Sequence, residues 1–216
     1  MNVVYPYLDH IIWVCADLDA GSRRFEALTG VRPRFGGVHT GGRTHNALAS
    51  IGTRCYLEIL APTGPPNAGD DAWCRIAHAA REPRVLTYCL RSPHPLPDLA
   101  ALALDRGWKD AVVAANGRTT PDGTALRWQW LAPKVDGLDL VFPFFIDWLD
   151  SPHPADTLTQ ASNQATLSLQ EFEVRHPEAT RLRRILTEIG TPIDTAHADT
   201  PGFLVVLETP KGRVAL

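Results

Sequence analysis

His10 and Glu58 are the residues of this sequence whose types and surroundings first suggest chemistry. His10 interrupts the strand-like run LDHIIWV, and Glu58 interrupts the apolar run CYLEIL. A carboxylate in such a run is costly to bury unless it is paired or bound to a metal ion. Each residue also has an ordinary interpretation. His10 could be a hydrogen-bonded core histidine, and Glu58 could lie on a solvent-exposed face of its strand.

His45 is a third candidate because it begins the run HNALASI, directly before the run that contains Glu58. Together with His10 and Glu58 it would complete a set of two histidines and one carboxylate, which suits Fe(II), Mn(II) or Zn(II). Equally, His45 and Asn46 could hydrogen-bond a turn. The order of the residues does not decide between these interpretations.

A polar strand face supplies candidate substrate-binding residues. In the run TALRWQWLA, Arg127 and Gln129 alternate with Trp128 and Trp130, so one face of the strand is polar and the other aromatic. If the polar face lines a cleft, Arg127 could hold a carboxylate or a phosphate bidentately. If that face meets solvent, Arg127 is an ordinary surface residue. Arg118, in the stretch NGRTTPDG, is a second candidate for the same role.

The elements that must position these residues repeat along the chain. The first set is a strand, a helix that ends at Gly30, a short strand and a hairpin, in the order β-α-β-β-β. The predicted elements span residues 8–15, 18–29, 31–35, 45–51 and 54–60. The loop GGVHTGG lies between two of these strands, and its glycines suggest a flexible lid over a cleft.

The same order recurs twice more. The second helix ends at Gly107 and the third at Gly190, so the spacings between the three helix-ending glycines, counted from Gly30, are 77 and 83 residues. The third helix carries apolar residues at helical spacing along one face. The second and third sets span residues 85–90, 97–106, 109–114, 124–132 and 138–145, and then 165–174, a helix from Pro177, 192–195, 203–208 and 212–216.

Composition excludes several classes of protein. The net charge of −3 gives no polybasic surface, so neither nucleic acid nor an anionic membrane is expected as a partner. We see no apolar run long enough to span a bilayer and no signal-peptide pattern in MNVVYPYLDH. The four cysteines are scattered without a CxxC pair, which favours reduced thiols and a cytoplasmic location.

Several stretches of residues 7–150 resemble those of a known superfamily. The sequence LDHIIWVCADLDA opens the first set, and GGRTHNALASIGTRCYLEILAP, PDGTALRW and FPFFIDW follow in order. These motifs resemble the vicinal oxygen chelate superfamily and, more narrowly, its glyoxalase-like proteins. The resemblance implies that two units pair around an open cleft. It also implies that a divalent metal there is chelated by two neighbouring substrate oxygens, which stabilises developing negative charge.

The resemblance also implies roles for individual residues. Metal ligands in that superfamily come from the first and fourth strands of a unit, which correspond here to His10 and Glu58. Both are therefore expected to be metal ligands and catalytic residues. The second unit departs from this pattern, because the spacing of 77 residues places Thr87 at the position of His10, and the fourth-strand run at 140–145 contains no carboxylate. This difference speaks against genuine glyoxalase I activity.

We therefore expect an α+β fold made of β-α-β-β-β units. Units 1–62 and 84–148, joined by a loop and a helix, would form a glyoxalase-like module over residues 1–150. Residues 151–164 would be a polar linker, and residues 165–216 a third unit that packs on the module or on another chain. An odd number of half-modules leaves a sheet face to be covered, and a homodimer would cover it.

Two functions fit these expectations. The first is a metal-dependent lyase, isomerase or dioxygenase-type enzyme that uses Fe, Mn, Zn or Ni and acts on a small oxygenated molecule. The second is a protein of the same fold that needs no metal and only binds or sequesters a small molecule. The retained His10 and Glu58 favour the enzyme, whereas the incomplete ligand set of the second unit favours the binding protein.

Overall fold

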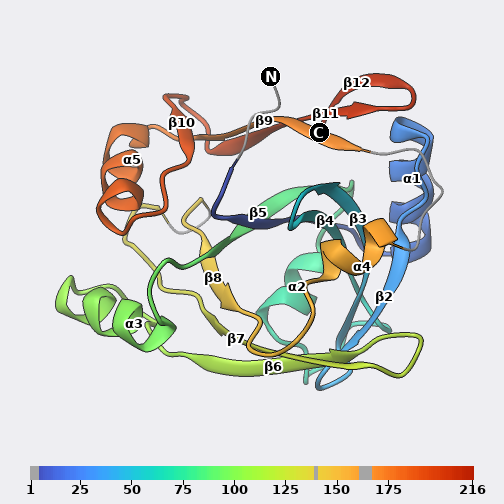
Figure 1. Cartoon of the computed structure of the whole chain (residues 1–216), viewed down its shortest axis with the longest axis horizontal. Helices are drawn as coiled ribbons and strands as arrows, with labels where there is room; N and C mark the ends of the chain where they lie inside the picture. The colour runs from blue at the N-terminus through green and yellow to red at the C-terminus, as the bar shows by residue number, and fades with distance from the viewer. Residues whose placement is uncertain (1–4, 139–140, 161–166) are drawn as a thin grey trace.

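Three β-α-β-β-β units follow one another along the chain, in the predicted order (Figure 1). The computed structural model describes residues 5–138, 141–160 and 167–216. Unit one consists of β1 (Leu8–Val14), α1 (Leu18–Thr29), β2 (Arg34–His39), β3 (Thr44–Gly52) and β4 (Cys55–Pro62). Unit two consists of β5 (Arg84–Arg91), α3 (Leu96–Asp105), β6 (Ala114–Thr119), β7 (Ala125–Leu131) and β8 (Phe144–Asp147).

Unit three and two connecting helices complete the fold. Unit three consists of β9 (Ser168–Arg175), α5 (Ala179–Glu188), β10 (Asp194–Ala196), β11 (Gly202–Thr209) and β12 (Gly212–Ala215). The connecting helices are α2 (Ala72–His78) and α4 (Pro154–Gln160). Among the described residues, no helix has both the length and the apolar character needed to cross a membrane.

Units one and two join into one closed barrel, with the strand order β1-β4-β3-β2-β6-β7-β8-β5. Within each unit the first strand pairs in parallel with the fourth, as β1 does with β4 and β5 with β8. The units meet through two antiparallel pairs, β1 with β5 and β2 with β6. The first and fourth strands of both units therefore lie next to each other, which places their inward side chains around one interior.

Capping residues determine where helix α1 of unit one begins and ends. The side chain of Asp17 accepts a hydrogen bond from the backbone N–H of Ala20 at 2.7 Å, which satisfies a donor at the start of the helix. Gly30 then adopts a left-handed conformation (φ 80°) that ends it. Between these caps, the buried side chains of Leu18 and Phe25 pack against the barrel.

Two strand predictions of unit two were shifted. The predicted strand 109–114 begins only at Ala114, because the chain turns at Asp110, which has a φ of 55° and accepts a hydrogen bond from the backbone N–H of Val112. The predicted strand 138–145 begins only at Phe144. Residues 139–140 of that prediction lie outside the described residues.

Unit three has the predicted order of elements but a different sheet. Its strand order is β10-β9-β11-β12, so the first strand lies in the middle and pairs in parallel with the second. In units one and two the first strand pairs with the fourth instead. The sheet packs on the barrel through Phe172, whose ring lies 5.0 Å from that of Tyr88 in β5. Unit three thus shares the hydrophobic core of the barrel without repeating its cavity-forming geometry.

The segment predicted as a polar linker, 151–164, packs against the barrel as far as it is described. It contains α4, which contacts β3 and β4, and His153, whose side chain is buried. Residues 161–166 of that prediction lie outside the described part of the chain. The linker prediction was therefore wrong for His153, because a buried carboxylate of β1 gives its ring a hydrogen-bond partner.

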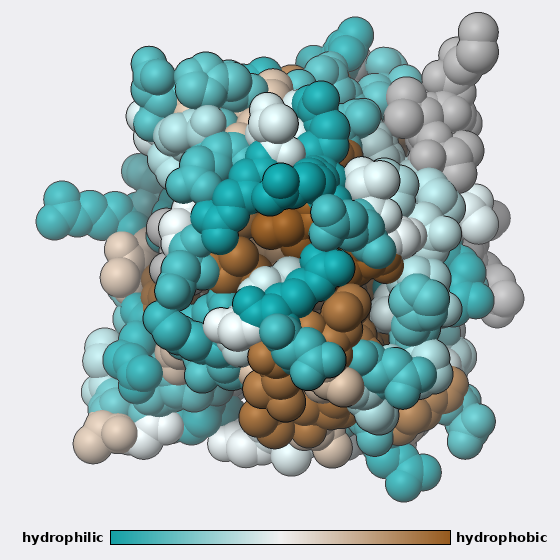
Figure 2. Space-filling model, turned by 90° about the vertical axis from the view of Figure 1, so that its left-hand side faces the viewer, coloured by the Kyte–Doolittle hydropathy of each residue, from teal (hydrophilic) through white to brown (hydrophobic). Residues whose placement is uncertain are grey.

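One side of the molecule shows hydrophobic side chains in the middle of a largely hydrophilic face (Figure 2). This is the side on which α3 and α5 lie in Figure 1. The exposed hydrophobic residues of the chain include Leu104 and Val112, which are 62% and 73% exposed. The predicted homodimer could cover such residues, and it stays a prediction.

Candidate functional site

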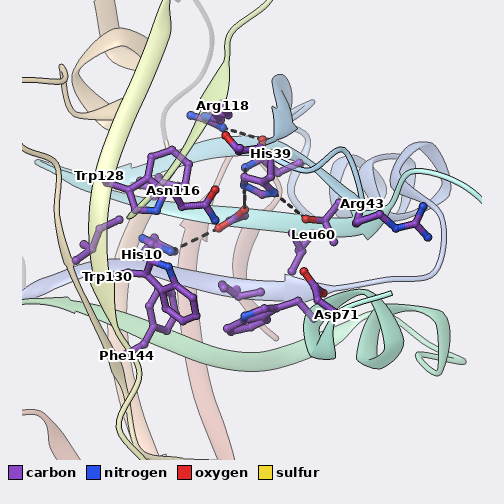
Figure 3. A pocket seen from close by; sticks show the side chains of 18 of the residues that line it. His10, His39, Arg43, Leu60, Asp71, Asn116, Arg118, Trp128, Trp130 and Phe144 are labelled. Atoms are coloured by element: carbon purple, nitrogen blue, oxygen red, sulfur yellow. Dashed lines mark hydrogen bonds and ion pairs between the residues drawn. The ribbon is translucent and has the colours of Figure 1, made fainter. Parts of the chain in front are cut away.

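The barrel contains a cavity of about 140 Å³ that combines polar and aromatic side chains (Figure 3). Because side chains alternate along a strand, every second residue of the lining strands points into it. Its polar lining residues include His10, His39, Asn46, Glu58, Asn116 and Arg118. Its aromatic lining residues are Tyr56, Trp73, Trp128, Trp130, Phe144 and Trp148.

Two histidines converge on the carboxylate of Glu58. The Nε2 atom of His10 lies 3.5 Å from Oε2 of Glu58, and Nε2 of His39 lies 3.6 Å from Oε1. His10 comes from β1, His39 from β2 and Glu58 from β4. Burial lowers the pKa of His39 below its ordinary value. The imidazole of His39 is therefore neutral at pH 7, which is the form that binds metals.

Asp9 orients the ring of His10. Adjacent residues of a strand normally point to opposite faces, but the pairing of β1 with β5 is irregular between Leu8 and His10. A bulge of this kind re-aims side chains. Oδ1 of Asp9 accepts a hydrogen bond from Nδ1 of His10 at 2.8 Å. The proton of a neutral His10 is thereby held on Nδ1, and the lone pair of Nε2 faces Glu58.

Asp9 is itself held by a buried network. Its carboxylate, which has no exposed surface, also accepts hydrogen bonds from Nε1 of Trp148, Nε2 of His153 and Nη1 of Arg91, each at about 3.2 Å. Burial opposes ionisation of Asp9, but the hydrogen bonds from His10 and His153 outweigh it. The pKa of Asp9 therefore lies well below its ordinary value.

Asn46 connects the carboxylate to the arginine that lines the cavity. Its Nδ2 donates to Oε1 of Glu58 at 2.7 Å, and its Oδ1 accepts from Nη1 of Arg118 at 2.7 Å. Arg118 lies on β6, in unit two, whereas Asn46 and Glu58 lie in unit one. The chain of hydrogen bonds therefore crosses the boundary between the units.

Three residues predicted for the site do not reach this cavity. His45 lies on the opposite face of β3 from Asn46, beside Phe35 and in a separate surface depression. Arg127 and Gln129 likewise lie on the other face of β7, because it is the tryptophan face that lines the cavity. Aromatic side chains gain more from burial than a guanidinium, which water solvates well. The interpretation of the polar face as the cleft face was wrong.

His39 was missed by sequence reasoning. It lies in GGVHTGG, which the structure shows to contain most of β2 and not a lid. A signal was present, since glycines inside a strand often mark a close approach by another group. At Gly36, a Cβ atom would clash with Oδ1 of Asn46 and with Nη1 of Arg118.

The donor types of this cluster suit a divalent metal, but the ligand atoms of His10, His39 and Glu58 do not all lie within 4.8 Å of one another in this arrangement. Each imidazole approaches a different oxygen of the carboxylate, at 3.5 and 3.6 Å, and Nε2 of His39 also lies 3.3 Å from Nδ2 of Asn46. Binding one ion through all three side chains would therefore require them to move closer together. Two imidazoles and one carboxylate suit Fe(II), Mn(II) or Zn(II). Cys89 lies near His10, but burial raises the pKa of its thiol well above the ordinary value, which makes it a poor ligand.

A second group of possible ligands lies at α2 and is less suited to a metal. Asp70, Cys74 and His78 bring donor atoms close together. However, Arg43 pairs with Asp70 and, as the main cause, lowers the pKa of that carboxyl to about 2. Burial raises the pKa of Cys74. A guanidinium already neutralises the carboxylate, so this group is an ion pair that anchors α2.

The sequence from residue 8 to residue 190 matches the family model described as a glyoxalase-like domain. This match spans most of the chain. The protein belongs to the glyoxalase-like domain family. The resemblance to glyoxalase-like proteins that was predicted from the sequence is thereby confirmed. No curated protein matches the sequence.

Solved structures are similar to this glyoxalase-like protein to different degrees. A hypothetical protein from Staphylococcus aureus has a TM-score of 0.66 at 18% identity, over 96% of this chain and 83% of that chain. Methylmalonyl-CoA epimerase in complex with methylmalonyl-CoA and NH4+ has a TM-score of 0.45 at 22% identity, over 70% of this chain and 100% of that chain. A variant of 4-hydroxymandelate synthase from Streptomyces coelicolor has a TM-score of 0.49 at 13% identity, over 97% and 61%.

Proposed function

We propose that this glyoxalase-like protein is a metal-dependent enzyme of the lyase, isomerase or dioxygenase type that acts on a small oxygenated molecule. The convergence of His10, His39 and Glu58 inside a cavity walled by aromatic side chains carries the proposal. A divalent Fe, Mn, Zn or Ni ion held by these residues would supply positive charge that stabilises negative charge on substrate oxygens.

Glu58 and His10 are the proposed catalytic residues. Asn46 donates to Oε1 of Glu58, and Oε2 of the same carboxylate faces His10. Because Asp9 holds the proton of His10 on Nδ1, Nε2 of His10 can bind an ion or accept a proton. The aromatic walls give the cavity a partly apolar lining, and a less polar surrounding strengthens electrostatic interactions within it.

A metal-free binding protein is the second candidate. It is supported by the positions in unit two that correspond to His10 and Glu58. Thr87 corresponds to His10 by the spacing of the helix ends. Glu58 pairs with Ile12, which lies two residues after His10, and Phe144 pairs with Cys89, which lies two residues after Thr87, so Phe144 corresponds to Glu58. Neither Thr87 nor Phe144 offers a strong metal ligand.

Metal uptake distinguishes the two candidates. Wild-type protein, stripped with a chelator and titrated with Zn(II), Mn(II), Ni(II) or anaerobic Fe(II) in a calorimeter, is expected to bind about one equivalent of at least one of these ions. Glu58→Gln or His10→Asn should lower the affinity by about 100-fold or more, because each variant loses a ligand atom. The control variant Thr87→Val should bind as the wild type does.

The opposite results would favour the binding protein. If the stripped wild type takes up none of the four ions, the enzyme proposal fails. It also fails if Glu58→Gln and His10→Asn, shown to be folded by circular dichroism, bind the ion with unchanged affinity.

A further inference from the structure

Arg118 is a buried cation with no anionic partner among the residues that the structure describes. Its side chain lies in β6, and the residue is only 6% exposed. No carboxylate in the described part of the chain lies within ion-pair distance of its guanidinium. Its Nε atom is buried and has no hydrogen-bond partner there. Burying a charge is costly unless a counter-charge or hydrogen bonds compensate it, so this position favours a ligand that brings negative charge.

The structure keeps Arg118 apart from the nearest carboxylate. Asn46 stands between them, accepting from Nη1 of Arg118 and donating to Oε1 of Glu58. Gly36 makes this arrangement sterically feasible, since a Cβ atom at that position would collide with Oδ1 of Asn46 and Nη1 of Arg118. The cation and the carboxylate are therefore held at two separate places, where each can serve a different part of one ligand.

The rest of the cavity favours a flat ring. Trp128, Trp130 and Phe144 line it together with Arg118 (Figure 3). The rings of Trp130 and Phe144 lie 6.4 Å apart in an edge-on arrangement, which is a geometry that aromatic groups adopt with one another. The volume of about 140 Å³ is close to that of a cavity known to take benzene, about 150 Å³. One six-membered ring with a small substituent fills such a space.

We infer that the cavity binds a small monocyclic aromatic carboxylate, with the carboxylate on Arg118 and the ring between Trp128, Trp130 and Phe144. A guanidinium and a carboxylate can form two parallel charge-assisted hydrogen bonds, which would use the free donors of Arg118. An oxygen substituent on the opposite side of the ring would then point toward His10 and Glu58. This last step rests on the proposed function, whereas the binding of the ring and the carboxylate does not.

Binding of benzoate to chelator-treated protein tests the inference without any metal. The titration would be followed by intrinsic tryptophan fluorescence and by the ¹H–¹⁵N signals of the indole groups. Benzoate is expected to bind at least about tenfold more tightly than benzamide, which has the same shape without the charge, and than acetate, which has the charge without the ring. Cyclohexanecarboxylate, with the charge but no aromatic ring, should fall in between.

Variants identify the cation that provides the preference. Arg118→Gln should remove the preference for benzoate over benzamide, whereas Arg127→Gln, at an exposed arginine on the neighbouring strand, should retain it. If wild-type protein binds benzoate no more tightly than benzamide, the carboxylate inference is overturned, whatever the folding state of the variants. A preference that persists in folded Arg118→Gln overturns the role of Arg118. Acetate binding as tightly as benzoate overturns the aromatic part.

The outcomes are separate from those of the metal experiment. A protein that binds benzoate through Arg118 but takes up no metal would retain this inference and lose the enzyme proposal. If the protein binds a metal through Glu58 but shows no preference for benzoate, the enzyme proposal is retained and this inference is lost.

Discussion

Units one and two of the barrel share an order of elements and a strand order, yet they contribute different chemistry. Unit one supplies the ionisable cluster of His10, His39 and Glu58. Unit two has Thr87 and Phe144 at the positions that correspond to His10 and Glu58, and it supplies aromatic walls and Arg118 instead. Backbone pairing and packing maintain the repeated fold, because they depend on the alternation of apolar residues and not on particular polar ones.

The two units differ in how many polar side chains they bury and in the hydrogen bonds that those side chains need. In β1, Asp9 and His10 are buried, and the carboxylate of Asp9 accepts hydrogen bonds from His10 and His153. At the corresponding positions of β5 the chain carries Leu86 and Thr87, and no such network is needed. Replacing a whole buried ionic network by apolar residues of similar volume is often neutral for stability, so the network of β1 points to a role beyond the fold.

The largest effect is expected when Asp9 of β1 is replaced by leucine, the residue type at the corresponding position of β5. Asp9→Leu leaves Arg91, His153 and Trp148 buried without their acceptor, and should lower the free energy of unfolding by about 3–5 kcal/mol. Urea denaturation followed by circular dichroism measures this. The control Asp17→Ala, which removes only a helix cap, should cost about 1 kcal/mol. A loss for Asp9→Leu no larger than that of the control would mean that the network is not structural.

The second expected effect distinguishes His39, which lines the cavity, from His45, which lies outside it. His39→Asn should lower metal affinity by about 100-fold, because it removes an imidazole that faces Glu58. His45→Asn, at a histidine on the outer face of β3, should leave the affinity unchanged. Calorimetric titration of both variants provides the measurement. Equal affinities would exclude His39 from the metal site.

The third effect concerns the boundary between the units. Gly36→Ala places a methyl group against Asn46 and Arg118, and overpacking of this kind typically costs about 1–3 kcal/mol. Gly202→Ala, in unit three, meets no atom within 4 Å and should change the free energy of unfolding by less than about 0.5 kcal/mol. Chemical denaturation of the two variants compares them. An unchanged stability of Gly36→Ala would show that the Asn46–Arg118 contact can move freely.

The smallest effect concerns the segment that joins the units. Arg43 lowers the pKa of Asp70 to about 2, from an ordinary value of about 3.9. A carboxyl group whose pKa falls on folding stabilises the folded state above its unfolded pKa, and this stabilisation disappears as the pH falls through the folded pKa. Asp70→Asn should therefore unfold at a lower temperature than wild type at pH 5–7, and the difference should vanish as the pH approaches about 2. Thermal melts across this range would detect it, and a difference that is independent of pH would contradict it.

Much of the fold could be predicted, because its signals are local. Apolar alternation marks most strands, and the glycines at 30, 107 and 190 mark the helix ends. Where the prediction was shifted, at β6, a left-handed residue, Asp110, bends the chain within an otherwise strand-like run. The strand order of unit three could not be predicted, since pairing depends on contacts between segments distant in sequence.

The candidate site was predicted in part, for the same reason. His10 and Glu58 were identified because a polar residue in an apolar strand is anomalous in the sequence itself. Arg118 was named only as a second candidate after Arg127, since the sequence of a half-buried strand does not show which face is the inner one. His39 lies among glycines, where neither hydrophobic alternation nor charge distinguishes it.

The sequence by itself determined the order of elements, the family and the unusual pair of polar residues in unit one, because local propensity and side-chain alternation are properties of neighbouring residues. Only the tertiary structure decided which faces point into the barrel. Closing the barrel brings β2 and β6 side by side, and this places His39 and Arg118 in one cavity with Glu58 while His45 and Arg127 remain outside. That outcome depends on strand pairing and on the burial of tryptophans, which are settled by the whole fold.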